Sequence, residues 1–312
     1  MREMSIYFNE TEPLEPIEND TWLDFEKQLL ESMGLFYDVH LYVSLVIYSL
    51  GVISNSLIIL FIATKRSRKM IVYHFLLLEL AIIDLTICCW LTFSTTLFLA
   101  MDEWVHDSQF RKAEIFFENV LTMTAIWVLV LLCSVKYRKI VHPFKRQPDK
   151  KVCLLVSILL FLSAFGFYIF RNSQVLIKIK FVWFAESAID IIPLAFFVFS
   201  HYKVWMYLKS NKMENPRVRA RHSRAVKTMS FLTVQFFVTV VLTRAASMIV
   251  YHINNSEQNE NFTLTRLSLI FYLFAFTNNI LNAVVYAKTM KDFRHFLRNI
   301  FTLNLRNRSP RN

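Results

Sequence analysis

An aspartate, Asp84, lies in the middle of an apolar run that covers residues 71–100. A charged side chain at the centre of a bilayer costs about 3 kcal/mol on insertion scales, so such a residue faces the interior of a helix bundle and is functional by default. Amide side chains occur in two further apolar runs, at Asn55, Asn278, Asn279 and Asn282. These groups predict a polar set in mid-membrane, whose simplest role is interhelical hydrogen bonding at about 0.6 kcal/mol per bond.

Further charged residues lie in other apolar runs, at Glu118, Glu186, Asp190 and Arg244. Glu186 and Asp190 are four residues apart and therefore share one face of a helix. Because buried charges tend to pair, one interpretation is an internal ion pair of Arg244 with Glu118 or Asp190.

A basic segment, VKYRKIVHPF, follows the apolar run 113–135 and places four basic side chains in ten positions. One interpretation is a charged stop at the edge of a membrane. The other is a motif that contacts a cytoplasmic partner.

These residues must be positioned by seven apolar runs, each long enough to cross a ~30 Å hydrocarbon core as a helix. The chain is 55% hydrophobic with 30 Phe and only 3 Gly, which suits helices whose side chains face lipid as well as each other. The segment 289–301 is too short and charged to cross, and its apolar residues at helical spacing predict an amphipathic helix on the membrane surface. The predicted fold is an all-α seven-transmembrane helix bundle with a short eighth helix. The predicted spans are 41–64, 71–100, 113–135, 152–170, 181–207, 228–252 and 264–287.

Charge predicts the orientation of the bundle. The loops on one face and the C-terminal segment carry 26 of the 35 Lys and Arg residues, and this positive excess marks the cytoplasmic side. We therefore expect an extracellular acidic segment 1–40, a bundle over 41–287 and a cytoplasmic segment 288–312. Because the charges form short clusters between apolar runs, we expect no nucleic-acid partner. Glycosylation sequons on the extracellular side agree with this topology, at Asn9, Asn19, Asn254 and Asn261, although another occurs at Asn307.

Several motifs follow one another in order along these runs. They are Gly51-Val-Ile-Ser-Asn55-Ser-Leu57, Leu80-Ala-Ile-Ile-Asp84-Leu85, Lys136-Tyr137-Arg-Lys-Ile140-Val-His-Pro143, the single Pro193, Asn278-Asn279-Ile-Leu-Asn282-Ala-Val-Val-Tyr286 and Phe293-Arg294. Together they resemble the rhodopsin-like (class A) G protein-coupled receptors, and the resemblance covers about residues 41–301.

The resemblance implies roles for these residues. Tyr286 and the mid-membrane polar set would form the switch core of the bundle, and Asp84 would be the centre of a sodium site, although Ala125 replaces a serine that the family often has. Glu118 aligns with the acid that binds the ammonium group in amine receptors, which offers a cationic ligand as the alternative to the internal ion pair. The ligand-facing candidates are Glu118, Glu186, Asp190, Arg244 and Tyr272. The G protein-facing candidates are Lys136, Tyr137, Ile140 and Pro143.

The chain also departs from the family. Val135 and Lys136 stand where the family has Asp-Arg, so the residue before Lys136 cannot restrain it. Val240 and Leu242 align with the Trp and Pro of the sixth span, and Arg111 aligns with the usual disulfide cysteine. These departures call the usual kink of the sixth helix and the usual switching mechanism into question.

We therefore expect a plasma-membrane receptor, with no enzymatic activity and no cofactor, that binds an extracellular peptide or small cationic ligand and activates a heterotrimeric G protein. Arrestin and the lipid bilayer are further expected partners. One alternative is an atypical seven-span receptor that binds ligand but couples weakly or not at all. A transporter is a weaker alternative, because the repeat halves and interrupted spans typical of transporters are not visible.

Overall fold

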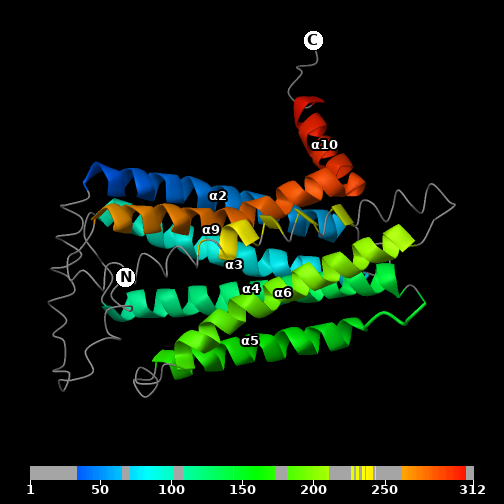
Figure 1. Ribbon diagram of the computed structural model, residues 1–312. Coiled ribbons are helices and arrows are strands. Elements are labelled where there is room, and N and C mark those ends of the chain that lie inside the picture. The colour runs from blue at the N-terminus through cyan, green and yellow to red at the C-terminus, as the bar shows by residue number, and fades with distance from the viewer. Residues whose placement is uncertain are drawn as a thin grey trace, which may run out of the picture.

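The computed structural model describes residues 34–64, 71–101, 108–142, 144–172, 181–210, 226–227, 230–231, 234–235, 237–241, 243 and 262–306. These residues form long helices that run side by side (Figure 1). The helices are α2 (Leu35–Thr64), α3 (Val72–Met101), α4 (Ser108–Val141), α5 (Lys150–Asn172), α6 (Phe181–Ser210), α9 (Phe262–Thr289) and α10 (Lys291–Arg306), with a π-helical turn η2 (Phe237–Val241).

Six of these helices are long and apolar enough to cross a membrane, judged over the described residues: α2 to α6 and α9. They correspond to six of the seven predicted spans and confirm the predicted helix bundle. The remaining predicted span, 228–252, lies largely outside the described residues. Its described part includes η2, a π-helical turn of the kind that commonly bends a helix. A bend in this segment therefore does not need the missing proline.

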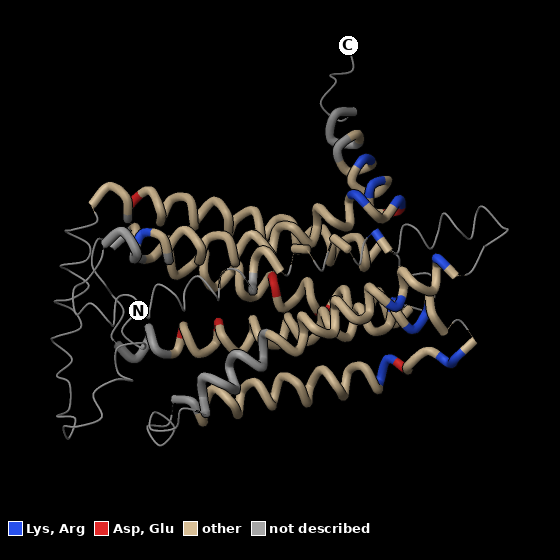
Figure 2. Tube along the Cα trace, viewed as in Figure 1, with Lys and Arg blue, Asp and Glu red and all other residues tan. Residues whose placement is uncertain are grey.

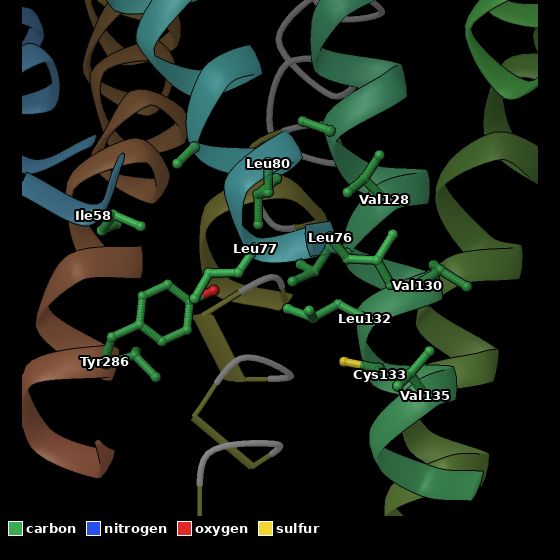
Figure 3. Packing of buried hydrophobic residues seen from close by; sticks show 14 of the residues in the cluster. Ile58, Leu76, Leu77, Leu80, Val128, Val130, Leu132, Cys133, Val135 and Tyr286 are labelled. Atoms are coloured by element: carbon green, nitrogen blue, oxygen red, sulfur yellow. The ribbon is translucent and has the colours of Figure 1, made fainter. Parts of the chain in front are cut away.

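The helices are arranged so that α2 packs against α3 and α9, while α4 packs against α3, α5 and α6. An apolar core between α2, α3, α4 and α9 holds the bundle together, and Figure 3 shows its central part. Residues such as Leu76 and Leu132 are fully buried there. Many apolar side chains on the outer faces of α5 and α6 are exposed instead, as expected for helices that face lipid.

Helix α4 is longer than the apolar run that predicted it. The run ends at residue 135, but the helix continues to Val141. The last turns can remain helical beyond the membrane because Arg138 and Lys139 are exposed while Ile140 is buried against α6. The basic segment therefore begins inside a helix rather than after one.

Helix α10 leaves the bundle at a steep angle to α9 (Figure 1). The backbone hydrogen bonds continue through the corner, since Met290 N donates to Tyr286 O at 2.8 Å. Phe293 is buried, and its ring lies 5.1 Å from the ring of Phe61 on α2, which fixes the start of α10 to the bundle. The predicted amphipathic eighth helix is confirmed, and it is longer than the segment 289–301.

The described Lys and Arg residues gather at the end of the bundle from which α10 departs, whereas the fewer Asp and Glu residues are spread along the bundle and occur at both ends (Figure 2). Arg266 is an exception, since its guanidinium lies 5.5 Å from the centroid of the Phe36 ring at the start of α2. This charge asymmetry agrees with a cytoplasmic location of the α10 end.

Candidate functional site

The centre of the bundle contains a hydrogen-bonded network that we call the core network, formed by Asp84, Asn282, Gln235, Asn278 and Thr239. Asn282 Nδ2 donates to Asp84 Oδ2 at 2.8 Å, joining α9 to α3. Asp84 is 1% exposed, so this bond forms away from water, where an unpaired polar group is costly. Two residues from the predicted polar set thus meet directly.

Gln235, which precedes η2, connects the network to the sixth segment. Its Nε2 lies 2.7 Å from Asn278 Oδ1, 3.1 Å from Asn278 O and 3.2 Å from Asn282 Oδ1. Thr239 Oγ1 donates to Gln235 O at 2.7 Å and lies 3.5 Å from Asn278 Oδ1. The sixth segment is therefore tied to α9 through amide groups.

A second group of polar contacts joins α2 to α9. Asn55 Nδ2 donates to Asn279 O at 3.1 Å and to Gly51 O at 3.0 Å. Asn279 Nδ2 in turn lies 3.6 Å from Cys88 Sγ on α3. Gly51 permits this close approach, because a Cβ built on it would lie 2.4 Å from Cys88 Sγ. Asn55 and Asn279 thus join α2 and α9, and Asn279 extends the contact to α3.

Tyr286 lies apart from the other members of the predicted polar set. Its ring is buried in the apolar core, and Figure 3 shows it beside Leu77. No described residue forms a hydrogen bond with its hydroxyl group. Tyr286 therefore contributes apolar packing here rather than a link in the core network.

Glu118 and Tyr272, two of the predicted ligand-facing residues, meet in the part of the bundle farther from α10. The Tyr272 hydroxyl lies 2.7 Å from Glu118 Oε1 and 2.8 Å from Oε2, joining α4 to α9. The Tyr272 ring also stacks edge-to-face with Phe276 at 4.7 Å, and Phe276 contacts Tyr48 at 5.1 Å. Tyr272 is thus held between an acid and an aromatic cluster that reaches α2.

The other ligand-facing candidates lie where the structure gives no side-chain description. Glu186 and Asp190 are on α6, but their side chains lie outside the described part, as does all of Arg244. The internal ion pair with Arg244 therefore stays a prediction. The glycosylation candidates Asn9, Asn19, Asn254 and Asn261 also fall outside the described residues.

The described G protein-facing candidates lie near the C-terminal end of α4. The ammonium group of Lys136 lies 4.6 Å from the centroid of the Tyr73 ring on α3. Val135 is buried in the apolar core, while Ile140 is buried against Val204 of α6, with Tyr137 beside it. Pro143 lies outside the described residues.

Sequence reasoning missed Gln235 and Tyr73. The sequence does indicate Gln235, because Gln235 and Thr239 are two polar residues one helical turn apart in an apolar run. They were overlooked because neither position belongs to a motif that carried the resemblance. The sequence offers no comparable signal for Tyr73, since its contact with Lys136 depends on how α3 and α4 pack.

Comparison with known proteins agrees with this arrangement. Residues 54–173 match the family model described as the 7 transmembrane receptor of the rhodopsin family, a segment that contains Asn55, Asp84, Glu118 and Lys136. A curated relative, the Tachykinin-like peptides receptor 86C of Drosophila melanogaster, is 27% identical over 108 residues. That alignment covers 35% of this chain and 21% of the relative, so the match spans about a fifth of the relative's length.

Proposed function

Because residues 54–173 match the family model of the rhodopsin-family seven-transmembrane receptors, we propose that this chain binds an extracellular ligand and activates heterotrimeric G proteins from the plasma membrane. Ligand binding would favour one packing of the helix bundle over another and so shift the population of a state that accepts the G protein. The receptor would use neither a cofactor nor a catalytic residue.

The observation that supports this mechanism is the path of α9 through the molecule. This single helix carries Tyr272 against Glu118, then Asn278 and Asn282 in the core network, then Tyr286 in the apolar core near the cytoplasmic end. A change at the Glu118–Tyr272 pair would be transmitted to the core by a rigid helix. Such a helix, with partners in α3, α4 and the sixth segment, is suited to a two-state packing change.

For the ligand, we propose a peptide or a small cationic molecule that contacts Glu118, Tyr272 and the predicted residues Glu186, Asp190 and Arg244. A negative carboxylate near the outer part of the bundle supports a positively charged ligand group. The name of the Drosophila relative, a receptor for tachykinin-like peptides, supports a peptide. The acidic segment 1–40, which we place outside the cell with glycans at Asn9 and Asn19, would favour a basic ligand through long-range attraction.

For the cytoplasmic partner, we propose that the G protein contacts Lys136, Tyr137, Ile140 and Pro143, with arrestin as a further partner of the same surface. The surrounding basic residues would also contact anionic lipid headgroups.

A second candidate is an atypical receptor that binds ligand but couples weakly. The observation that favours it is the contact of Lys136 with Tyr73, because a lysine held by an aromatic ring is less available to a cytoplasmic partner. Lysine also lacks the planar five-donor fork of arginine.

The two candidates are separated by measuring G protein activation in cells that express this chain, against a panel of peptides and amines. A ligand response in the wild type supports the coupled receptor. No response in the wild type but a response in Lys136→Arg, at equal surface expression, supports the atypical receptor.

A further inference from the structure

We propose that the side-chain amide of Gln235 takes the place of a cation among the oxygens of the core network, so that the polar core of this chain does not bind sodium. The family resemblance leads one to expect sodium beside Asp84. The contacts of the described residues do not fit that expectation.

Three oxygens of α9 that could attract a cation already accept hydrogen bonds. Gln235 Nε2 lies against three oxygens from α9: Asn278 Oδ1 at 2.7 Å, Asn278 O at 3.1 Å and Asn282 Oδ1 at 3.2 Å. Several protein oxygens that converge on one point are the surroundings a hard cation needs. Here they converge on an amide nitrogen, whose hydrogens carry partial positive charge.

The orientation of the Gln235 amide follows from Asp84, which Asn282 connects to Gln235 by two hydrogen bonds. Asp84 Oδ2, as a carboxylate oxygen, accepts, so Asn282 must present Nδ2 to it at 2.8 Å. The other end of the Asn282 amide, Oδ1, then faces Gln235 and accepts a hydrogen bond from Gln235 Nε2. Turning the Gln235 amide over would place its oxygen against three other oxygens, which hydrogen bonding disfavours. The direction of every amide from Asp84 to the sixth segment is thus determined.

Few oxygens are left for a cation beside Asp84. Its Oδ1 has no hydrogen bond from a described residue, but Oδ2 is engaged by Asn282. Ala125, buried on α4 where the family often has a serine, contributes no hydroxyl group. Asn55 Oδ1 also has no hydrogen bond from a described residue, but the Asn55 amide lies against the backbone of Asn279, not against Gln235. Gln235 Oε1 likewise has no hydrogen bond from a described residue. Among the described residues these three oxygens are fewer than the ligands that a bound cation usually has.

The presence of Gln235 in place of a cation also has a structural consequence. A cation would neutralise the core without belonging to any helix, whereas Gln235 belongs to the sixth segment and lies two residues before the π-helical turn η2. Movement of the sixth segment away from α9 must therefore break the contacts of Gln235 Nε2. The hydrogen bonding of the core network and the position of the sixth segment are therefore coupled by the Gln235 side chain.

The test is the unfolding temperature of the purified full-length chain in a lipid nanodisc, measured in sodium chloride and in choline chloride at equal ionic strength. For the wild type we expect the same unfolding temperature in both salts. In Gln235→Ala the amide is removed and its space is opened, so we expect sodium to raise the unfolding temperature by about 2–4 °C relative to choline. Thr243→Val, a buried substitution on the same segment outside the core network, should respond to sodium as the wild type does.

Two results would overturn the proposal. A sodium-dependent rise in the wild type would show that the core accepts the cation despite Gln235. A folded Gln235→Ala variant without any response to sodium would show that the glutamine is not what excludes the cation. If Gln235→Ala does not fold, the wild-type comparison can still overturn the proposal, and the same Gln235→Ala substitution is then measured in a background stabilised by substitutions elsewhere. Because the readout is unfolding, the result does not depend on whether the chain couples to a G protein.

Discussion

The ammonium group of Lys136 on α4 lies 4.6 Å from the centroid of the Tyr73 ring on α3. Val135, the residue before Lys136, has an apolar side chain and cannot restrain the ammonium group by an ion pair. The structure adds a contact from another helix that a sequence motif cannot reveal. A cation over an aromatic face is stabilised by about 0.5–2 kcal/mol, depending on desolvation, so Tyr73 can partly replace the missing acid.

Removing this ring should release Lys136. We expect Tyr73→Leu to raise basal G protein activation about two- to fivefold, which corresponds to the loss of about 0.5–1 kcal/mol from the resting state. Tyr73→Phe keeps the ring face and should stay close to the wild type. The measurement is ligand-independent signalling at equal surface expression, and equal basal signalling of the Leu and Phe variants would contradict a restraining role for the ring.

At the Glu118–Tyr272 pair, the contribution of the negative charge to the ligand response can be separated from that of the hydrogen bond. Glu118→Gln keeps a side-chain oxygen that can accept from the Tyr272 hydroxyl, but it removes the negative charge. If the charge binds a cationic ligand, the concentration needed for half-maximal response should rise at least about tenfold, since a charged hydrogen bond contributes about 1.5–3 kcal/mol. Surface expression should not change.

Tyr272→Phe is the matched control for this experiment, because it removes the hydrogen bond and leaves the charge. A structural role for Glu118 would appear instead as poor surface expression of Glu118→Gln with an unchanged ligand response in the protein that reaches the membrane.

Asn282 is the residue on which the core network depends most, because it donates to Asp84 and accepts from Gln235. We expect Asn282→Ala to lower the free energy of unfolding by about 1–3 kcal/mol, the cost of leaving buried partners unsatisfied. Thermal unfolding of the purified chain measures this. Asn119→Ala is the control, since the Asn119 amide donates within its own helix to Ile115 O, and its loss should cost less. Equal losses in both variants would contradict the central place of Asn282.

The close contact of α2 with α3 predicts a steric effect at Gly51. A Cβ there would lie 2.4 Å from Cys88 Sγ, so Gly51→Ala should destabilise the chain by about 1–3 kcal/mol, as overpacking does in a close-packed core. Adding Cys88→Ala removes the sulfur and should restore much of the loss. A double mutant no more stable than Gly51→Ala would show that Cys88 is not the source of the clash.

Sequence reasoning predicted most of the fold because membrane spans are read directly from apolar length, as at α3 and α5. It also selected Asp84 and Asn282, which meet, since a polar residue in an apolar run is conspicuous. It could not predict Tyr73 beside Lys136 or Gln235 among the asparagine oxygens, because these contacts depend on the rotation of one helix against another. The motif groups Tyr286 with the polar set, but its position on α9 directs its side chain toward the apolar core.

The central claim is that this bundle activates a G protein. The most direct measurement is guanine-nucleotide exchange on purified Gα subunits, representing each class, by nanodiscs that contain the purified chain, with empty nanodiscs as the baseline. We predict exchange above the baseline for the wild type with at least one Gα subunit, and a further increase with Tyr73→Leu. Exchange at the baseline for the wild type, Tyr73→Leu and Lys136→Arg with every Gα subunit, both without ligand and with the panel of peptides and amines, in protein shown to be folded, would contradict the claim.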